Sequence, residues 1–422
     1  MMQSFILAIA CCFTIFTSAY TQKKQRASGN MPDTGLVRKL LRQHPGYFQR
    51  MLDHPDSFRV QIMYTQINRD KNNKPSFREF TYNLHNNQYF YPASTVKMPI
   101  VFLALEKLNE LNINGLTKSA TMITDSSSEG QDVVYTHPRA EDSRPGIEHY
   151  IKQVLLVSDN DAFNRLYEFL GQEYIRQKLT DKGYPDAIIR HRLNVSKSAE
   201  QNRHTNPVHF YDTNGVLLYS KPGQYSQAAF PALTVKLGTG YYSNGNLVNE
   251  PFNFSEKNRV YLQDQHHILQ SVLFPEVTNR KQKFNLTDDD YVFLKHWMSA
   301  YPKESNYPYY DSTEYWDAYC KFLVHGSEKG PLPNNIRIFN KVGDAYGFLT
   351  DITYVADFEN KVEFMLSATI SCNSDGIYND DQYDYETVGF PFMKNLGRMV
   401  YEYELARKRK YLPDLGKFQI QY

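Results

Sequence analysis

The segment around Ser94 most constrains how this chain folds. Polar, strand-like residues lead into Ser94-Thr95-Val96-Lys97, and an apolar run at helical spacing follows from Met98 to Leu108. Ser94 is therefore expected at a helix N-terminus, with Lys97 one turn later on the same face. Backbone N–H groups and the helix dipole favour negative charge there, and an amine of lowered pKa can take the hydroxyl proton. An ordinary helix start is the alternative, since Ser-x-x-Lys recurs by chance.

A second polar triplet, Ser158-Asp159-Asn160, separates two helical patterns. Apolar spacing predicts one helix over Ile147–Val157 and another over Asp161–Leu170, with Gly171 as its C-cap. Taken alone, the triplet is better explained as a helix N-cap, because Ser, Asp and Asn are the preferred cap residues.

Together the two motifs resemble the signature of the class A β-lactamase and penicillin-binding-protein superfamily of active-site serine enzymes. That signature is S-x-x-K, S-D-N and a later K-T/S-G on a strand. Lys341-Val342-Gly343 is one candidate for the third motif, because two strand-like segments and a long closing helix follow it, as in that family. Lys236-Leu237-Gly238 has no such sequel, so Lys341 is preferred.

The resemblance implies an α/β (α+β) fold of the β-lactamase/DD-peptidase kind: an antiparallel sheet flanked by helices, plus an all-helical subdomain. It covers most of the chain, because a helix expected over 36–51 and strands over 58–67 and 77–83 precede Ser94, and a helix over about 390–410 ends the fold. The segment of about 200–335 is longer than a compact member needs. We interpret it as an elaboration of the helical half, with a hairpin around Asn-Gly and helices over 258–273 and 288–300.

The resemblance also assigns four catalytic residues. Ser94 would be the nucleophile and Lys97 its base. Ser158 would pass a proton to the departing nitrogen, helped electrostatically by Lys341. Each of the two lysines disfavours protonation of the other, which is what a neutral base requires.

Three more residues are expected to bind substrate: Asn160, Gly343 and Asp344. Asn160 would hydrogen-bond the substrate amide. The oxyanion hole would consist of the backbone N–H groups of Ser94 and of Asp344, just beyond the glycine.

Two departures from the family pattern bear on turnover. Val342 stands where the family has a hydroxyl residue that helps bind a substrate carboxylate. Class A β-lactamases also carry a Glu three residues before a Leu-Asn pair, and here that position before Leu193 is Arg190. His191 and Glu200 are nearby without the expected spacing, so efficient β-lactam hydrolysis is in question.

Residues 1–22 resemble a secretory signal peptide: an apolar run from Phe5 to Phe16, then small residues and cleavage near Ala19 to Gln22. This predicts a periplasmic or secreted protein whose single hydrolase domain spans 23–422, with no membrane span after signal removal. A lipoprotein anchor on Cys11 or Cys12 is the less favoured alternative.

Composition adds little chemistry. A net charge of +1 does not favour nucleic acid. Cys320 and Cys372 can pair in an oxidising compartment. No cofactor and no metal are expected, because the adjacent His266 and His267 point to different faces of a helix. We expect a monomer.

A tyrosine-rich stretch, 307–319, has two explanations. It is either a platform on which sugars stack or ordinary half-buried packing, and packing is preferred in so tyrosine-rich a chain.

The sequence therefore predicts an exported serine acyl-hydrolase that forms an acyl-enzyme on Ser94 with a β-lactam or a peptidoglycan-like amide or ester. The alternatives are a DD-peptidase-like enzyme and a non-catalytic penicillin-binding or sensing protein of the envelope.

Overall fold

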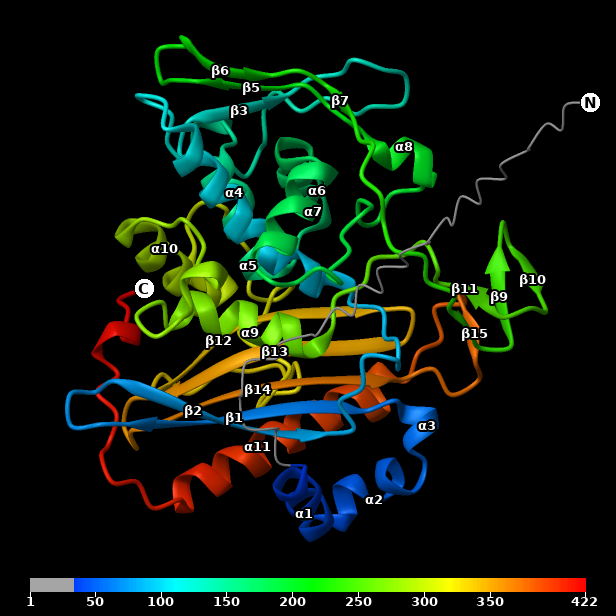
Figure 1. Cartoon of the computed structure of the whole chain (residues 1–422), viewed down its shortest axis with the longest axis vertical. Helices are drawn as coiled ribbons and strands as arrows, with labels where there is room; N and C mark the ends of the chain where they lie inside the picture. Colours follow the sequence, from blue (N-terminus) through cyan, green and yellow to red (C-terminus); the bar gives the residue numbers. More distant parts are fainter. Residues whose placement is uncertain (1–33) are drawn as a thin grey trace, which may run out of the picture. The chain divides into compact units, whose positions relative to one another are not determined.

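A computed structural model describes residues 34–422 and is built around a five-stranded antiparallel sheet (Figure 1). The strand order is β12-β13-β14-β1-β2, so chain segments from both ends of the sequence meet in the sheet. These strands are β12 (Ile336–Ala345), β13 (Phe348–Asp357), β14 (Val362–Ser371), β1 (Gln61–Arg69) and β2 (Pro75–Tyr82).

Helices cover both faces of this sheet, which explains why its central strands are buried on both sides. Helices α1 (Gly35–Gln43) and α11 (Phe390–Ala406) pack on one face, and α9 (Leu262–Leu273) packs on the other. Neighbouring residues such as Tyr354 and Val355 belong to two separate hydrophobic cores, one on each face. The fold expected from the sequence is confirmed.

The helical part of the molecule contains the helices next to the Ser94 and Ser158 motifs. It contains α4 (Lys97–Leu111), α5 (Ile147–Val157), α6 (Asn160–Leu170), α7 (Gln172–Asp181) and α10 (Asp288–Ser299). Helix α4 is buried almost all round, because it packs against both α5 and α6.

The single helix expected over 36–51 is wrong. The chain forms two short helices, α1 and α2 (Pro45–Asp53), and His44 between them has non-helical backbone angles. Pro45 explains the break, since proline disfavours a helical conformation in the preceding residue and starts helices readily. A further turn, α3 (Pro55–Phe58), precedes β1.

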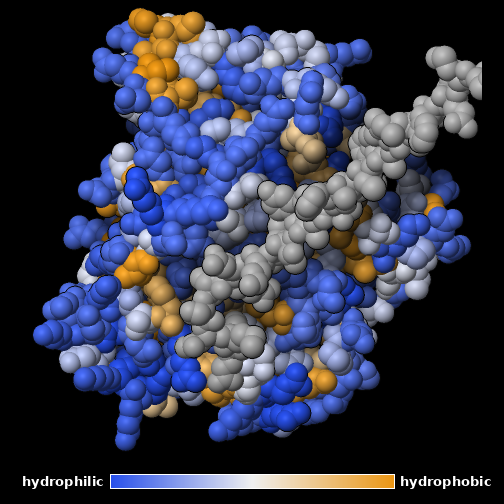
Figure 2. Space-filling model, viewed as in Figure 1, coloured by the Kyte–Doolittle hydropathy of each residue, from blue (hydrophilic) through white to orange (hydrophobic). Residues whose placement is uncertain are grey.

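The 200–335 segment is not only an extension of the helical part. The expected hairpin is present as β5 (Val208–Tyr211) and β6 (Leu217–Lys221), which form a sheet with β3 (Thr121–Thr124). Its turn exposes Val216 and Leu217, and Figure 2 shows apolar surface at this end of the molecule. Helix α9, from the same segment, packs on the main sheet. The shorter elements of the segment are α8 (Ala199–Arg203), β4 (His204–Thr205), β7 (Gln224–Tyr225), β8 (Lys236–Leu237), β9 (Gly240–Ser243), β10 (Asn246–Val248) and β11 (Phe252–Asn253).

Other predictions have mixed outcomes. The signal peptide lies outside the described residues. Cys320 and Cys372 are both buried and free, so they do not pair in this structure. Within 34–422, no helix is long and apolar enough to cross a membrane, and no cluster of three or more His, Cys, Asp or Glu is placed to hold a metal ion.

Candidate active site

Ser94 lies in a 3-10 turn, η1 (Ala93–Val96), that runs directly into α4. The turn is fixed by Thr95, whose backbone N–H and hydroxyl both donate to the Pro92 carbonyl at 3.0 and 2.6 Å. Ala93 has a φ of 47°, an uncommon conformation for a residue other than glycine. Strained residues of this kind persist where the surrounding structure holds them, and they concentrate at functional sites.

Ser94 opens onto a cavity of about 870 Å³. Asn160 and Asp344 line the same cavity. The predicted nucleophile and two predicted substrate-binding residues are therefore in one place, although they come from η1, α6 and β12.

Lys97 is completely buried beneath this cavity. Its Nζ donates to the carbonyl of Ser158, to Ser158 Oγ at 3.3 Å and to Asn160 Oδ1 at 2.7 Å. None of these bonds goes to Ser94, and no carboxylate pairs with the amine among the described residues. Burial, followed by the positive charge of Lys341, lowers the pKa of Lys97 well below that of an ordinary lysine.

Ser158 lies between the two lysines. It is the C-cap of α5 in a left-handed conformation with a φ of 60°, and Asp159 caps α6 by accepting a hydrogen bond from the Ala162 N–H at 2.8 Å. Lys341 Nζ donates to Ser158 Oγ at 2.7 Å. The triplet is thus both a helix cap and the link between the lysines, so the two explanations offered by the sequence are compatible.

Lys341 and Gly343 lie on β12, the edge strand of the main sheet, against η1. Burial lowers the pKa of Lys341 to about 8. A Cβ atom on Gly343 would lie 2.8 Å from the backbone nitrogen of Ser94 and 2.7 Å from the Pro92 carbonyl oxygen, so only glycine allows this approach. The rival Lys236 is exposed on β8.

Position 342 does not have the carboxylate-binding role that the family pattern implied. Side chains alternate between the two faces of a strand, and Val342 is 1% exposed in the core beneath α11, on the face opposite to Lys341. A hydroxyl at this position would lie in that apolar core and would not reach a substrate in the cavity.

We call η1 with Lys97, the α5–α6 turn and β12 the core wall of the cavity. The loop wall is the part of the lining formed by residues 190–199 and 379–385. The loop wall contains the position of the missing glutamate, Arg190, whose guanidinium lies 3.5 Å from Glu256.

The other two candidate bases, His191 and Glu200, are not placed to activate a water molecule in the cavity. His191 Nε2 accepts from the Asn258 N–H at 3.1 Å, and its Nδ1 lies 2.6 Å from the Arg192 carbonyl, so both ring nitrogens are engaged. Burial also lowers the pKa of His191 to about 4. Glu200 is exposed on α8, bonded to Tyr225 and not part of the cavity lining.

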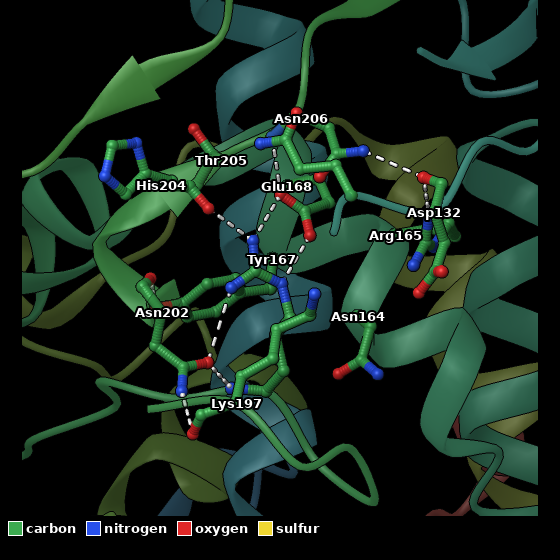
Figure 3. Close-up of polar contacts among 12 residues, drawn as sticks. Asp132, Asn164, Arg165, Tyr167, Glu168, Lys197, Asn202, His204, Thr205 and Asn206 are labelled. Carbon is green, nitrogen blue, oxygen red and sulfur yellow. Dashed lines mark hydrogen bonds and ion pairs between the residues drawn. The ribbon is translucent and has the colours of Figure 1, made fainter. Parts of the chain in front are cut away.

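A buried ion pair holds the 190–206 segment in place (Figure 3). Arg192 donates to both carboxylate oxygens of Glu168 on α6, at 2.5 and 2.9 Å, and to the carbonyl of His204 at 2.5 Å. Glu168 also accepts from the Asn206 N–H at 2.8 Å. Sequence reasoning missed this pair, because nothing in the chain links a glutamate on one helix to an arginine in a later loop.

Asn164 adds a second anchor for the same loop. Its side chain donates to the Leu193 carbonyl at 3.0 Å and accepts from the Leu193 N–H at 2.9 Å. The Leu-Asn pair noted in the sequence is therefore held to α6 by backbone hydrogen bonds.

The second part of the loop wall is attached to the 236–253 insertion. Strand β15 (Ile377–Tyr378) pairs with β9 in parallel, and Gly238 lies so close that a Cβ atom would be 2.3 Å from the Gly376 carbonyl oxygen. The insertion thus supports the segment that presents Asn379 and Asp381 to the cavity.

Comparison with known families agrees with the two N-terminal motifs. Residues 48–219 match the family model described as "Beta-lactamase enzyme family", and this range contains both Ser94-x-x-Lys97 and Ser158-Asp159-Asn160. This part of the chain is therefore similar to the β-lactamase enzyme family. Lys341 lies outside the matched range, so its assignment to the third motif rests on its hydrogen bond to Ser158.

Solved structures similar to this chain include PBP-A, at 15% identity and a TM-score of 0.48, over 88% of this chain and 98% of that one. A β-lactamase from Xanthomonas campestris has 12% identity and a TM-score of 0.48, over 86% and 97%. A β-lactamase from Sphaerobacter thermophilus has 11% identity and a TM-score of 0.46, over 87% and 95%. No curated protein matches.

Proposed function

We propose that this protein is an exported serine acyl-hydrolase that forms an acyl-enzyme on Ser94. The observation that carries the proposal is the arrangement of Lys97 and Lys341 on either side of Ser158 Oγ, at 3.3 and 2.7 Å, in the core wall that also presents Ser94. Buried amines of lowered pKa can exchange protons near neutral pH, which ordinary lysines cannot do.

The proton path that we propose uses these side chains. Neutral Lys97 takes the proton of the Ser94 hydroxyl as its oxygen attacks the substrate carbonyl. Lys97 then returns a proton to Ser158 Oγ, and Ser158 gives its own proton to the departing nitrogen. Lys341 keeps Ser158 oriented through the 2.7 Å hydrogen bond and stabilises negative charge nearby.

The oxyanion in this scheme is bound by the backbone N–H groups of Ser94 and Asp344. The close approach of Gly343 to the Ser94 nitrogen supports this assignment, because it brings the next residue of β12 beside the same turn. Asn160 is held by Lys97 through its Oδ1, which leaves the amide nitrogen for a substrate acceptor.

The substrate we propose is a β-lactam or a peptidoglycan-like amide or ester. The cavity carries the cationic groups of Arg190, Lys197 and Lys257 along its lining, which suits a substrate with a carboxylate. Its volume of about 870 Å³ is at the upper end of the range for small-molecule sites and accommodates a peptide-like substrate.

A DD-peptidase-like activity is the second candidate, and the loop wall favours it. Glu256 and Asp381, the carboxylates at the cavity outside the core wall, are both exposed, and Glu256 lies beside Arg190. A positioned base contributes about 10²–10⁴ in rate, so water should resolve a penicillin adduct slowly. A peptide amine can resolve an acyl-enzyme without such a base.

The decisive experiment is incubation of the purified protein with a fluorescent penicillin, followed by gel imaging and intact mass. We expect a covalent adduct on Ser94 that clears slowly. Ser94→Ala should lose the adduct, whereas Ser196→Ala, a serine in the loop wall of the same cavity, should keep it. Rapid turnover would support efficient β-lactam hydrolysis. Absence of any adduct, or labelling of Ser94→Ala at the same peptide, would contradict the acyl-enzyme.

Export is a separate part of the proposal and rests on residues 1–22. Its test is the N-terminal mass of the protein recovered from cell fractions. We expect a chain that starts near residue 23 in the periplasmic or secreted fraction, and an uncleaved chain in the cytoplasm would contradict export.

A further inference from the structure

A second hollow, of about 360 Å³, lies on the surface around the tyrosine-rich stretch. We call it the tyrosine groove. It shares no lining residue with the catalytic cavity. The side chains that matter for the argument are Arg139, Tyr307, Tyr309, Asp311, Glu314 and Tyr315.

Two of its rings are unusually accessible. Tyr309 is 67% exposed, more than any other tyrosine of the described chain, and Tyr307 is 55% exposed. Their neighbour Tyr310 is only 2% exposed and packs against Leu156 and Val157. The packing explanation therefore accounts for Tyr310 and does not account for Tyr307 and Tyr309. Exposed aromatic rings grouped in a hollow are typical of a binding surface.

Packed rings and the Arg139 guanidinium form the base of the groove. The Arg139 guanidinium lies over the rings of Tyr310 and Tyr315, at 5.2 and 5.9 Å from their centroids. Tyr315 in turn contacts Tyr310 at 5.0 Å and Tyr319 at 5.1 Å between centroids. Because the guanidinium lies against these ring faces, it acts as part of the groove floor.

The rim supplies hydrogen-bond acceptors. Asp311 and Glu314 are exposed carboxylates, and Asp311 uses Oδ1 to accept from the backbone and hydroxyl of Thr313 at 2.8 and 2.6 Å. This leaves Asp311 Oδ2 and the Glu314 carboxylate facing solvent beside the exposed rings. The two carboxylates outnumber the single cation, Arg139, among the lining residues, which disfavours an anionic ligand. A purely apolar ligand would leave the hydration of the carboxylates unreplaced.

Rings flanked by carboxylates suit one ligand chemistry in particular. The C–H groups of a pyranose carry partial positive charge and lie flat on the negative face of an aromatic ring. Its neighbouring hydroxyls donate to carboxylate oxygens. We propose that the tyrosine groove binds uncharged sugar units of an oligosaccharide or glycan, through stacking on Tyr307 and Tyr309 and hydrogen bonds to Asp311 and Glu314.

The groove is tied to the catalytic region through Tyr310. This residue packs on the last turn of α5, immediately before Ser158. The groove is therefore connected, through the packing of Tyr310, to the helix whose C-cap is Ser158. Sugar binding at this surface is independent of acyl transfer and does not require Ser94.

The test is isothermal titration calorimetry of the full chain with two neutral probes, the tetrasaccharide of N-acetylglucosamine and maltotetraose. A proline-rich peptide serves as a third ligand, because such peptides also dock in aromatic grooves. We expect at least one sugar probe to bind, with equal affinity for wild type and Ser94→Ala. Tyr309→Ala and Glu314→Gln should each weaken binding about tenfold or more, whereas Tyr47→Ala, which removes a 57% exposed ring on α2, should not change it.

Two results overturn the proposal. One is the absence of binding by both sugar probes, or binding of the proline-rich peptide in their place. The other is sugar binding that Tyr309→Ala and Glu314→Gln leave unchanged. Thermal unfolding of each variant is measured alongside, and these exposed side chains should alter it little.

Discussion

The core wall and the loop wall of the catalytic cavity are built in different ways. The core wall consists of η1, the α5–α6 turn and an edge strand, and its two lysines bond directly to Ser158. The loop wall consists of irregular chain. The Arg192–Glu168 pair anchors its first segment, and the pairing of β15 with β9 anchors its second. One wall contains buried reactive groups, whereas the other contains exposed polar groups and buried supports.

This difference separates the two halves of an acyl-transfer reaction. In the proposed reaction, formation of the acyl-enzyme uses a nucleophile, a base and a proton donor, all of which we assign to the core wall. Its resolution by water needs a base on the opposite side, where the chain has Arg190. The two halves can therefore be tested by substitutions in each wall.

Lys97→Met should have the largest effect. Methionine fills similar space without the amine, so acylation by a fluorescent penicillin should slow by about 10²–10⁴. The rate of adduct formation in stopped flow measures this. A wild-type rate would show that another group acts as the base and would remove the core wall from the chemistry.

Glu168→Gln tests the loop wall. The variant leaves Arg192 buried without a full counter-charge, which should lower the free energy of unfolding by about 3–5 kcal/mol. Denaturant unfolding measures this loss of stability. In acylation kinetics, the rate constant at saturating substrate should fall less than the apparent affinity for the substrate.

The matched control for Glu168→Gln is Asp142→Asn, which breaks an exposed pair with Arg144 and should cost about 1 kcal/mol or less. An equal and small loss in both variants would mean that Arg192 does not depend on Glu168. A selective loss of the acylation rate constant would mean that the two walls are not separable.

The pH profile tests Lys341. Because its pKa is lowered to about 8, Lys341 loses its charge above that pH, and the acylation rate should fall by roughly tenfold on that side. Lys341→Gln should remove this alkaline limb. It should also move the acidic limb to higher pH, because the positive charge of Lys341 helps to keep Lys97 neutral.

Lys236→Gln is the control for the pH profile, since Lys236 is exposed in the rival motif. A profile that responds to Lys236→Gln and not to Lys341→Gln would exchange the two assignments.

Val342→Thr should have the smallest effect on activity. The side chain lies in the apolar core, so the new hydroxyl should reduce stability by about 1–3 kcal/mol. Val355→Thr, in the same core on the next strand, should behave alike. A selective gain in acylation by carboxylate-bearing substrates would show that position 342 faces the cavity after all.

The order of elements and the core wall could be predicted from the sequence, because they depend on local patterns. Apolar spacing predicted α5, α6 and α9 to within a few residues, and short motifs selected Ser94, Lys97 and Ser158. The break at His44 was missed although Pro45 indicated it, since the helical periodicity continues across the break.

The loop wall could not be predicted, because its contacts join segments far apart in the chain. Glu200 was a reasonable candidate by distance along the sequence, but it is exposed on α8, where Tyr225 donates to its carboxylate outside the cavity lining. The orientation of Val342 has another origin. Side chains alternate along a strand, so Val342 faces away from Lys341, and the three-residue motif does not indicate this.

The two buried lysines also govern how the fold itself responds to pH. In the unfolded chain an amine of this kind binds its proton up to a pKa of about 10.4. In the folded chain the pKa of Lys341 is lowered to about 8, and burial lowers the pKa of Lys97 well below that of an ordinary lysine. Between these values the unfolded state holds more protons, so folding becomes more favourable as pH rises. For Lys341 alone the difference amounts to roughly 3 kcal/mol. The reactive amines are thus a burden on the native state at neutral pH, and the rest of the sheet and its helices must outweigh them.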